Sequence, residues 1–453
     1  MTADARYVIR ASDPVRSGPA GWLDQVTAAA RRAPVAYREQ LARRRRRTIA
    51  ITILALLFVL YPLINTLLLQ PLVRSGVPLP VPDDTVATFM LIFAAMAIGL
   101  NIVAGFAGLL DLGYVAFYAL GAYTAAFFAS PHFASLSLVL FSEVAPGYPG
   151  IHVPFFVIVP LAALIAATFG VLLGAPTLRL RGDYLAIVTL GFGEIVPVVF
   201  KNLVGINFQL GPIKLENANL TGGAVGINPI DPPSFFGIDF GATSGQAAVY
   251  LAMVIVVLSV IIARNLERSR MGRAWMAIRE DELAAEMMGV NTVRTKLLAF
   301  GLGASFAGVA GSLQASYLGA TTSDFFQFST SILVLIMIIL GGIGNIWGVM
   351  AGALALVYVD KTFLPWIAQR VQAINSDLPN AAQFNFLIFG IILVIMMRFR
   401  PEGFIPSRQR AAELRHAPPG QQIGSAATLG EDAVKSEETS QAIAAEQAAE
   451  PDA

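Results

Sequence analysis

The stretch RGDYLAIVTLGFGEIVP, residues 181–197, combines an apolar run typical of a membrane helix with a carboxylate near each end. On an α-helix, Asp183 and Glu194 differ in azimuth by only about 20° and are separated by a rise of roughly 16 Å. If Asp183 lies at a membrane surface, Glu194 lies near the middle of a hydrocarbon core about 30 Å thick. A carboxylate at that depth usually faces a bundle interior or a wet cavity, so this helix predicts functional groups inside a membrane protein.

The composition of the whole chain supports this interpretation. Of its 453 residues, 56% are hydrophobic and 13% are charged, whereas soluble domains carry about 25% charged residues. Several apolar stretches are long enough to cross a bilayer as helices, and the alternation typical of a membrane β-barrel is absent. We therefore expect an all-α, polytopic helical membrane protein with about 8–10 transmembrane segments, some broken or re-entrant.

The sequence also argues against several kinds of chemistry. It contains no cysteine, and its three histidines, His132, His152 and His416, show no ligand spacing, so we expect no metal site. It contains no Gly-Lys pair and hence no GxxxxGK[ST] phosphate loop. With no nucleophile motif or cofactor loop, a membrane enzyme has little support, and we expect no catalytic residue and no cofactor bound by this chain.

The distribution of charge predicts the topology. Arg43 to Arg47 form an unbroken basic run directly before the first apolar stretch, and basic residues beside a span usually stay in the cytoplasm. Such a run indicates topology rather than nucleic-acid binding, so no nucleic-acid partner is expected. The segment 264–296 is also rich in Arg and Lys, whereas the 131–153 loop contains neither. Both termini are therefore expected in the cytoplasm.

The spans and domains follow from this pattern. We expect a basic cytoplasmic N-terminal arm at 1–47, a transmembrane permease domain at 48–406 and a disordered, acidic cytoplasmic tail at 407–453. The predicted spans are 48–69, 86–110, 112–130, 154–175, 184–200, 246–263, 297–319 and about 380–397, with a broken segment at 331–359.

Glycines interrupt two apolar stretches. A single crossing at SILVLIMIILGGIGNIWGVMAGALALVYV, residues 331–359, would place the C-terminal arginines outside. The GGIGN at 341–345 instead predicts two half-helices, each too short to span, that dip in and return to the same face. A similar interruption, GFAGLLDLG at 105–113, contains Asp111. Paired broken helices are typical of inverted-repeat transporters, but a plain loop at Asp111, or glycines that only allow close packing, would give the same pattern.

The polar stretch RMGRAWMAIREDELAAEMMGVNTVRTK, residues 270–296, lies between two spans. Its acidic cluster favours a helix N-terminus, its alanine pair propagates a helix and Gly289 can end it. Met287, Met288 and Val290 supply an apolar edge. A short helix of this kind can lie in a groove of another protein, and the alternative is a solvated connector.

Here the chain resembles a known family. The order of an acidic residue, two alanines, three residues and a glycine is similar to the coupling loop through which ABC importer permeases contact their ATPases. Together with RGDYLAIVTLGFGEI, the TGG of LTGGAVGI, LLAFGLGASFAGVAGSLQ and MMRFRPEGF, it resembles a LivM-type permease of branched-chain amino-acid ABC importers from about residue 86 to 406. The resemblance implies the ABC importer permease fold. It also implies that the coupling positions are Arg279, Glu280, Asp281, Glu282, Ala284, Ala285 and Gly289.

The same resemblance implies partners and a location. It predicts two ABC ATPase subunits that carry ATP and Mg²⁺, a shorter LivH-type permease that forms a heterodimer with this chain, and an extracytoplasmic solute-binding protein. Membrane lipid surrounds the complex in the bacterial inner (plasma) membrane. In the loop at 202–245, Thr221, Gly222 and Gly223 are candidates for the binding-protein contact or a gate, and a purely structural turn is the alternative.

The candidate path or gate residues lie in or near one of the two glycine-rich breaks or on the helix that contains Asp183 and Glu194. They are Asn101, Asp111, Asp183, Thr189, Gly191, Gly193, Glu194, Gly341, Gly342 and Asn345. Asp183 is alternatively an interfacial cap or ion-pair residue. Pro197 strains the helix behind Glu194, and the nearby glycines let a neighbour approach, so Glu194 either lines the path or makes a static buried hydrogen bond.

Three functions remain open at this point. The first is an importer permease for branched-chain amino acids. The second is a related ABC permease for urea or a short amide on the same scaffold. The third is a proton-coupled secondary transporter in which Glu194 carries the proton. Uptake that requires ATPase subunits would separate the first two functions from the third.

Overall fold

The computed structural model describes residues 59–74, 79–133, 138–139, 150–177, 183–210, 213–235, 238–374, 384–400 and 403–405. The chain divides into two compact units, Met1–Ile64 and Asn65–Ala453. In the first unit only residues 59–64 are described, and they are helical. The predicted N-terminal arm and C-terminal tail lie outside the described residues.

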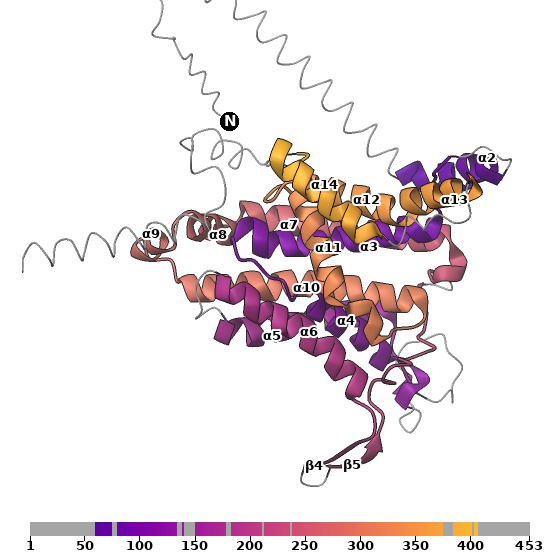
Figure 1. The fold of residues 1–453 in the computed structure, drawn as a ribbon. Helices are drawn as coiled ribbons and strands as arrows, with labels where there is room; N and C mark the ends of the chain where they lie inside the picture. The colour runs from indigo at the N-terminus through magenta and orange to yellow at the C-terminus, as the bar shows by residue number, and fades with distance from the viewer. Residues whose placement is uncertain are drawn as a thin grey trace, which may run out of the picture. The chain divides into compact units, whose positions relative to one another are not determined.

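Most of the described chain is helical (Figure 1), as the sequence predicted. The helices of the first half are η1 Asn65–Leu69, α2 Gln70–Arg74, α3 Asp84–Leu100, η2 Asn101–Phe106, α4 Val115–Phe128, η3 Pro131–Phe133, α5 Phe155–Thr177, α6 Asp183–Asn202 and η4 Ala242–Ser244. Those of the second half are α7 Gln246–Arg268, α8 Arg270–Glu280, α9 Glu282–Met287, α10 Thr292–Leu318, η5 Ser323–Phe326, α11 Phe328–Gly341, α12 Ile346–Tyr358, η6 Val359–Phe363, α13 Leu364–Ile374 and α14 Asn385–Phe399.

The strands are short and confined to the loops between helices. They are β1 Ala129–Ser130, β2 Leu138–Val139, β3 Ile151–His152, β4 Ile206–Leu210, β5 Ile213–Ala218, β6 Ser234–Phe235 and β7 Ile238–Asp239. β3 pairs antiparallel with β1 and parallel with β2, while β4–β5 and β6–β7 form antiparallel pairs. None of these pairings closes a barrel among the described residues, so the helices form the membrane-spanning part.

Six described helical runs are long and apolar enough to cross a membrane, and four shorter apolar helices accompany them. The long runs are Asp84–Phe106, Phe155–Thr177, Tyr184–Asn202, Gln246–Arg268, Thr292–Leu318 and Ile346–Ala373. The first five overlap predicted spans, and two further predicted spans, 112–130 and about 380–397, correspond to the shorter helices Val115–Phe128 and Asn385–Phe399. The run Ile346–Ala373 was not predicted as a span. The chain is a multi-pass membrane protein.

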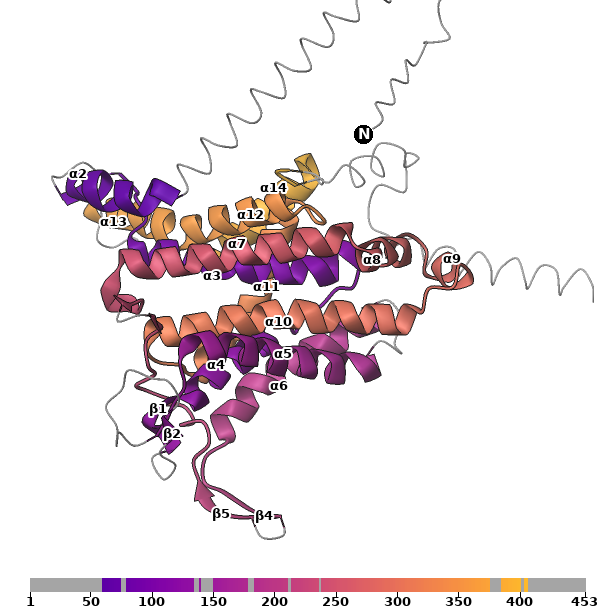
Figure 2. The same cartoon turned by 180° about the vertical axis from the view of Figure 1, so that it is seen from behind.

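α10 is the central helix of the bundle. It packs against α5, α4 and α3, and α3 in turn packs against α7 and α12 (Figures 1 and 2). Glycines make the closest of these crossings, since a Cβ at Gly121 of α4 would overlap the backbone of Gly308 in α10. A Cβ at Gly311 would overlap the carbonyl of Tyr118 in the same way. Close packing of this kind stabilises helix pairs in lipid, where no hydrophobic driving force acts between them.

Both predicted breaks are present. α3 continues into the π-helix η2, and the chain is then non-helical until α4 begins at Val115. Asp111 and Leu109 are buried in this stretch, whereas Gly108 and Leu110 are exposed, so the break extends from the interior of the described bundle to its surface. At the second break, residues 342–345 form a turn between α11 and α12, which pack side by side.

The expected shape of the second break is wrong in one respect. α11 and α12 have only 14 and 13 residues, but α12 is not an isolated half-helix. It continues through η6 into α13 as one run of spanning length, Ile346–Ala373. A π-type turn at η6 accommodates Asp360 and Lys361 without ending the helix.

We expect Gly121→Ala to destabilise the protein, because the added methyl group would force α4 away from α10. Overpacking a close contact costs about 1–3 kcal/mol, so the apparent Tm of the purified, detergent-solubilised protein should fall. Gly390→Ala in α14 is the matched control, since a Cβ there meets nothing within 4 Å. Equal Tm values for the two variants would contradict the assigned α4–α10 contact.

Candidate functional site

α8 and α9 extend beyond the ends of the long helices (Figures 1 and 2). Ser269 begins α8, because its hydroxyl accepts a hydrogen bond from the Gly272 amide at 3.1 Å. The fully buried Trp275 anchors α8 to the bundle, and its Nε1 donates to the Thr295 carbonyl of α10 at 2.7 Å. The projecting segment is therefore fixed to the central helix at its base.

The predicted single helix is in fact two. Asp281 interrupts it in an extended conformation and caps α9, accepting a hydrogen bond from the Ala284 amide at 3.0 Å. Glu280 consequently ends α8, and it does not begin the second helix as the sequence suggested. Gly289 follows α9 with a φ of +85°, a conformation that favours glycine, as predicted for the end of that helix.

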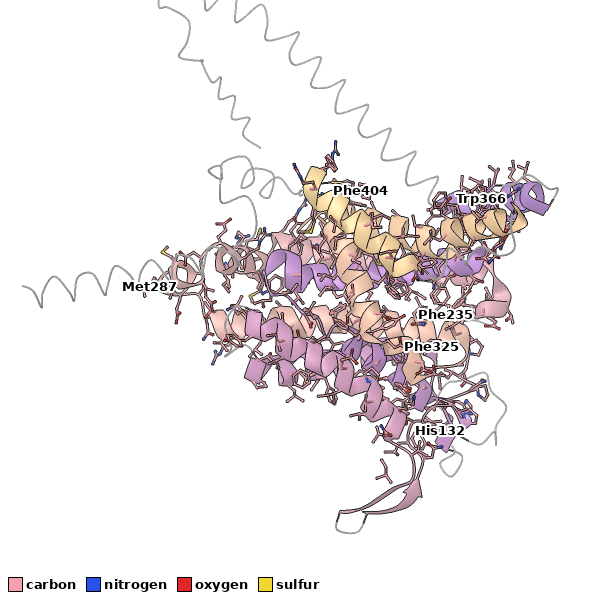
Figure 3. The ribbon with its side chains drawn as sticks, viewed as in Figure 1. His132, Phe235, Met287, Phe325, Trp366 and Phe404 are labelled. Carbon is pink, nitrogen blue, oxygen red and sulfur yellow. The ribbon has the colours of Figure 1, made fainter. Side chains whose placement is uncertain are left out.

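The side chains of α9 divide into two faces. Leu283, Met287 and Met288 are exposed, the two methionines by 85% and 86%, whereas Ala285 is buried. Figure 3 shows Met287 at one end of the described part of the chain. Glu282 pairs with Lys296 of α10 at 2.5 Å. The apolar edge expected from the sequence is present, and it has no covering element among the described residues.

Arg279 points inward, away from that edge. Its Nη1 donates to the Gly105 carbonyl of η2 at 2.7 Å. A Cβ at Gly108, which has a φ of +71°, would lie 2.8 Å from Arg279 Cγ. Gly108 therefore admits the arginine, whereas the space at Gly105 is taken up by Asn101 and Gly344. Arg279 joins α8 to the first break.

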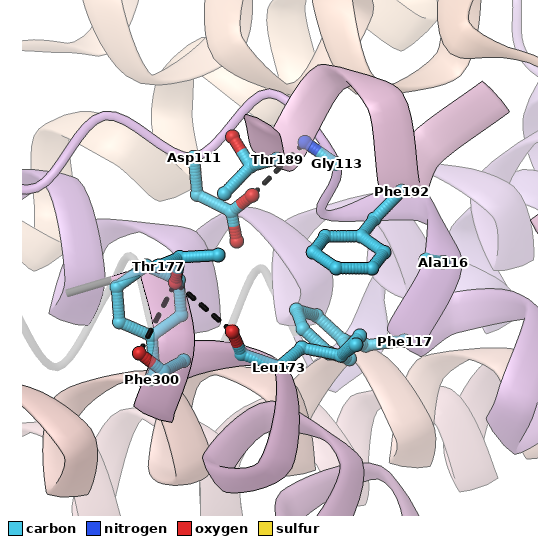
Figure 4. Close-up of a pocket in the computed structure, with 10 residues that line it drawn as sticks. Asp111, Gly113, Ala116, Phe117, Leu173, Thr177, Thr189, Phe192 and Phe300 are labelled. Atoms are coloured by element: carbon cyan, nitrogen blue, oxygen red, sulfur yellow. Dashed lines mark hydrogen bonds between the residues drawn. The ribbon is translucent and has the colours of Figure 1, made fainter. Parts of the chain in front are cut away.

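The first break places the buried Asp111 in a small pocket (Figure 4). One carboxylate oxygen of Asp111 accepts a hydrogen bond from the Gly113 amide at 2.9 Å, and the other has no partner among the described residues. Thr189 of α6 accepts a hydrogen bond from the Leu112 amide at 3.1 Å. The other lining residues include Thr177, Phe117, Phe192 and Phe300. Asp111 and Thr189, both predicted path residues, thus meet at one buried site.

α6 closes this site with a thin face. A Cβ at Gly193 would lie 3.1 Å from the Cα of Gly113, so the close approach expected at the glycines occurs at this position. A Cβ at Gly191 meets nothing within 4 Å, and this glycine permits no close contact. The structure describes the backbone of Asp183 as the start of α6 and nothing of its side chain.

Glu194 does not make the static buried hydrogen bond that the sequence left open. It is exposed on α6, beside the exposed Ile195 and Val198, and makes no hydrogen bond or ion pair with any described residue. The acidic side of the helix faces away from the bundle because Thr189 and Gly193 occupy the side that packs against the break. Glu194 could therefore line a translocation path only if another subunit covers this face of α6.

The second break meets the same π-helix as the first. The side-chain oxygen of the buried Asn101 accepts a hydrogen bond from the Gly344 amide at 2.9 Å. Gly341 packs on the backbone of Gly348, and Gly342 has a φ of +112°. Asn345 caps α12 through the Trp347 amide and donates to the Ile405 carbonyl at 2.9 Å. Gly341, Gly342 and Asn345 thus build the turn itself.

The TGG motif also has a structural part. Thr221 is buried and donates to the Phe200 carbonyl at 2.5 Å. Gly222 and Gly223 adopt φ values of +72° and +60°, and a Cβ at Gly222 would overlap the Gly226 carbonyl. Val225 in the same turn is 84% exposed and contributes to its surface.

One polar pair was missed from the sequence. The buried His152 of β3 lies with its Nδ1 2.5 Å from a carboxylate oxygen of Asp231. Burial raises the pKa of Asp231, while the hydrogen bond with His152 opposes that rise. The pair joins two loops on the side of the bundle opposite α9, and no sequence signal connects residues so far apart. The described residues contain no cluster of His, Cys, Asp and Glu that fits a metal ion.

Comparison with known proteins gives consistent matches. The family model for the permease component of branched-chain amino acid transport systems matches residues 84–397. The chain is 36% identical, over 73% of its own length and 72% of the relative's, to the high-affinity branched-chain amino acid transport system permease protein LivM of Escherichia coli K12. It is 25% identical to the corresponding permease BraD of Pseudomonas aeruginosa, over 69% of this chain and 91% of BraD.

A third match is to a different permease of the same kind of system. The chain is 30% identical to LivH of Escherichia coli K12, over 34% of this chain and 46% of LivH. No solved structure matches the chain.

We expect Thr189→Val to expose the Leu112 amide, because valine keeps the shape of threonine and removes its hydroxyl acceptor. An unsatisfied buried N–H costs about 1–3 kcal/mol, so hydrogen exchange at Leu112 should accelerate about tenfold or more. Mass spectrometry of the 107–114 region measures this. Thr168→Val is the control, since that exposed hydroxyl bonds only within its own helix. Unchanged exchange in Thr189→Val would contradict the contact.

Proposed function

The chain belongs to the family of permease components of branched-chain amino acid transport systems, and from this premise we propose that it forms part of an ABC importer's translocation path for these amino acids. The observation that carries the proposal is the projecting α9, which is apolar on its exposed edge and tied at its base to the first helix break. A permease that changes conformation when its ATPases move needs a helix that contacts the ATPases and is joined to the membrane-spanning part.

An ABC ATPase is the partner that we assign to α9. Leu283, Met287 and Met288 form a small apolar surface on a short helix, which suits insertion into a groove of another protein. The negative charges of Glu280 and Glu286 border that surface and are exposed. ATP and Mg²⁺ would bind to the ATPases, because this sequence has no phosphate loop.

We propose that α8 transmits the movement of α9 to the membrane-spanning helices. Trp275 holds α8 to α10, and Arg279 holds it to Gly105. Movement of α9 against the bundle would therefore act first on η2 and the break that follows it. Asp111 and Thr189 lie at that break, so a shift there changes the buried polar site. Coupling between distant sites needs an element with two discrete arrangements, and we assign that part to η2 and the break.

A second permease subunit is proposed at the exposed face of α6. Glu194 lies there among apolar residues of a helix of spanning length, and a lipid-exposed carboxylate at that depth is costly. A LivH-type permease over this face would remove Glu194 from lipid and place it between the two subunits. In that position Glu194 would line the path, which is the remaining reading from the sequence.

The binding protein would dock at the opposite end of the molecule. The 202–245 loop and its turn at 221–226 lie on that side, and Val225 is the exposed side chain of the turn. With α9 in the cytoplasm, this end lies outside the bacterial plasma membrane, and α14 returns the C-terminus to the cytoplasm. Gly222 and Gly223 would act by shaping the turn.

Two alternatives make different demands. A urea or amide permease would use the same ATPases but would not discriminate by aliphatic side chain. A proton-coupled transporter would need no ATPase and would lose activity in Glu194→Gln. Reconstitution of the chain with a LivH-type permease, ATPases and binding protein in proteoliposomes tests all three. ATP-dependent uptake of leucine, with no uptake of urea, is the expected result. Leucine uptake driven by a proton gradient without ATPases would overturn the proposal.

We expect Met287→Asp to detach the ATPases, because it places a charge in the proposed apolar contact. The fraction of ATPase that co-purifies with the permease should fall about tenfold or more, as for loss of a central interface residue. Val225→Asp is the matched control, since Val225 is equally exposed at the other end. Normal co-purification with Met287→Asp, or equal loss with Val225→Asp, would count against the assignment of α9.

Arg279→Met should behave differently. The thioether keeps the bulk against Gly108 but cannot donate to the Gly105 carbonyl, and loss of such a charge-assisted bond costs about 1.5–3 kcal/mol. The ATPases should remain bound and hydrolyse ATP, while leucine uptake per ATP hydrolysed falls about tenfold. The measurement is the ratio of the two rates in proteoliposomes. An unchanged ratio would show that Arg279 does not transmit the movement.

A further inference from the structure

A second cavity lies in the half of the bundle opposite α9. Its volume is about 470 Å³, within the range of small-molecule pockets. It is lined where α3 begins, α10 ends, α11 begins and α12 ends. Figure 3 shows its lining residue Phe325 far from Met287. The cavity shares no residue with the Asp111 pocket.

Aromatic rings form the apolar part of this outer cavity. Phe89, Phe93, Tyr118 and Phe325 line it, and the rings of Phe93 and Tyr118 lie 6.4 Å apart. Leu318, Leu333 and Val357 complete the apolar surface. A branched aliphatic side chain is complementary to such a surface, and the faces of the rings also attract a cation.

Two buried polar atoms in the lining have no hydrogen-bond partner among the residues that the structure describes. Gln314 is 7% exposed and Tyr118 is 1% exposed. The Gln314 side-chain oxygen and the Tyr118 hydroxyl make no hydrogen bond with any described residue. A buried polar group without a partner costs about 1–3 kcal/mol, so both atoms are set to receive a hydrogen bond from something inside the cavity.

Some charged groups in the lining have a partner within the described chain and one does not. Lys361 pairs with Asp360 at 3.1 Å, and Asp360 also accepts a hydrogen bond from Asn385 at 3.2 Å. Asp324 also lines the cavity, and it has no ion pair or hydrogen bond within the described part of the chain. The uncommitted groups are therefore a carboxylate and an amide oxygen, which together suit an ammonium group.

We propose that the outer cavity holds a free α-amino acid with an aliphatic side chain before it moves inward. Its ammonium group binds near Asp324 and Gln314, its carboxylate lies toward Lys361, and its side chain lies among the aromatic rings. The proposal rests on the proposed function and adds the location of the site. A lipid acyl chain would fill the apolar part and leave Asp324, Gln314 and Tyr118 without partners.

Photo-leucine, a diazirine analogue of leucine, tests this directly. The probe is irradiated with the assembled transporter in nanodiscs, with and without binding protein, and cross-links on this chain are mapped by mass spectrometry. We expect labelling in 89–93, 314–318 and 324–333, displaced by leucine. 4-Methylpentanoate, which is leucine without its ammonium group, should displace the probe at least about tenfold less well, as expected for loss of the charged contact.

Variants separate the site from its surroundings. Gln314→Leu and Asp324→Asn should each lower leucine-displaceable labelling about tenfold. Gln369→Leu is the matched control, because Gln369 is exposed on α13 and outside the cavity. If a variant fails to fold, photo-leucine labelling of the unmodified chain still tests whether the amino acid binds in the outer cavity.

The outcomes are distinct from those of the proposed function. Leucine-displaceable labelling of the cavity supports the site, even where ATP-dependent uptake fails and the transport proposal falls. Normal leucine uptake with labelling elsewhere overturns the site and leaves the transport proposal standing. Cavity labelling that a fatty acid displaces and leucine does not assigns the cavity to lipid and also overturns it.

Discussion

The hydrogen bond from Arg279 to the Gly105 carbonyl is the contact on which the rest of this structure depends. It connects a helix that extends beyond the bundle to the point where a membrane helix ends inside it. The contact needs three local features. Asp281 ends α8 just beyond the arginine, Gly105 presents a carbonyl in the last turn of η2, and Gly108 leaves room for the side chain. α8 also packs against α7 and α10, and this hydrogen bond joins it to η2 itself.

η2 connects the two breaks as well. Asn101, at its start, accepts a hydrogen bond from the turn between α11 and α12, and Gly105, near its end, accepts one from Arg279. A π-helix has an irregular hydrogen-bond ladder and commonly occurs at functional sites. A small change in this short element therefore reaches the Asp111 pocket on one side and the α11–α12 turn on the other. α3, α11 and α12, which adjoin the two breaks at one end, contribute residues from their other ends to the lining of the outer cavity.

Much of this arrangement could be predicted from the sequence. Apolar runs gave the spans, and glycine clusters at 105–113 and 341–345 gave both breaks, because glycine weakens helices in a strongly apolar segment. The acidic, alanine and glycine pattern gave α9 and its end at Gly289. These features depend on local backbone preferences, which a short stretch of sequence contains. Asp111 and Thr189 were each predicted as path residues, Asp111 in a break between spans and Thr189 within a span, but their meeting at one site was not predicted.

The remaining features depend on contacts between distant segments. The family resemblance placed Arg279 among the coupling positions, and its inward contact with Gly105 depends on the packing of α8 beside η2. Glu194 looked buried because it lies in a span, yet which side of α6 is covered depends on where Gly113 approaches it. The outer cavity takes its lining from several separate segments of the chain, and no spacing within one of them indicates it. The continuation of α12 into α13 required η6 to absorb two charges.

Distance measurements by electron paramagnetic resonance test the central connection most directly. The chain has no native cysteine, so spin labels can be placed on cysteines that replace Met287 in α9, Leu110 in the first break and Val225 in the outer turn, all of them exposed. On ATP binding to the assembled transporter, we expect the 287–110 distance to stay constant while the 110–225 distance changes. A constant 110–225 distance with a changing 287–110 distance would show that α9 moves independently of the break, which contradicts this account.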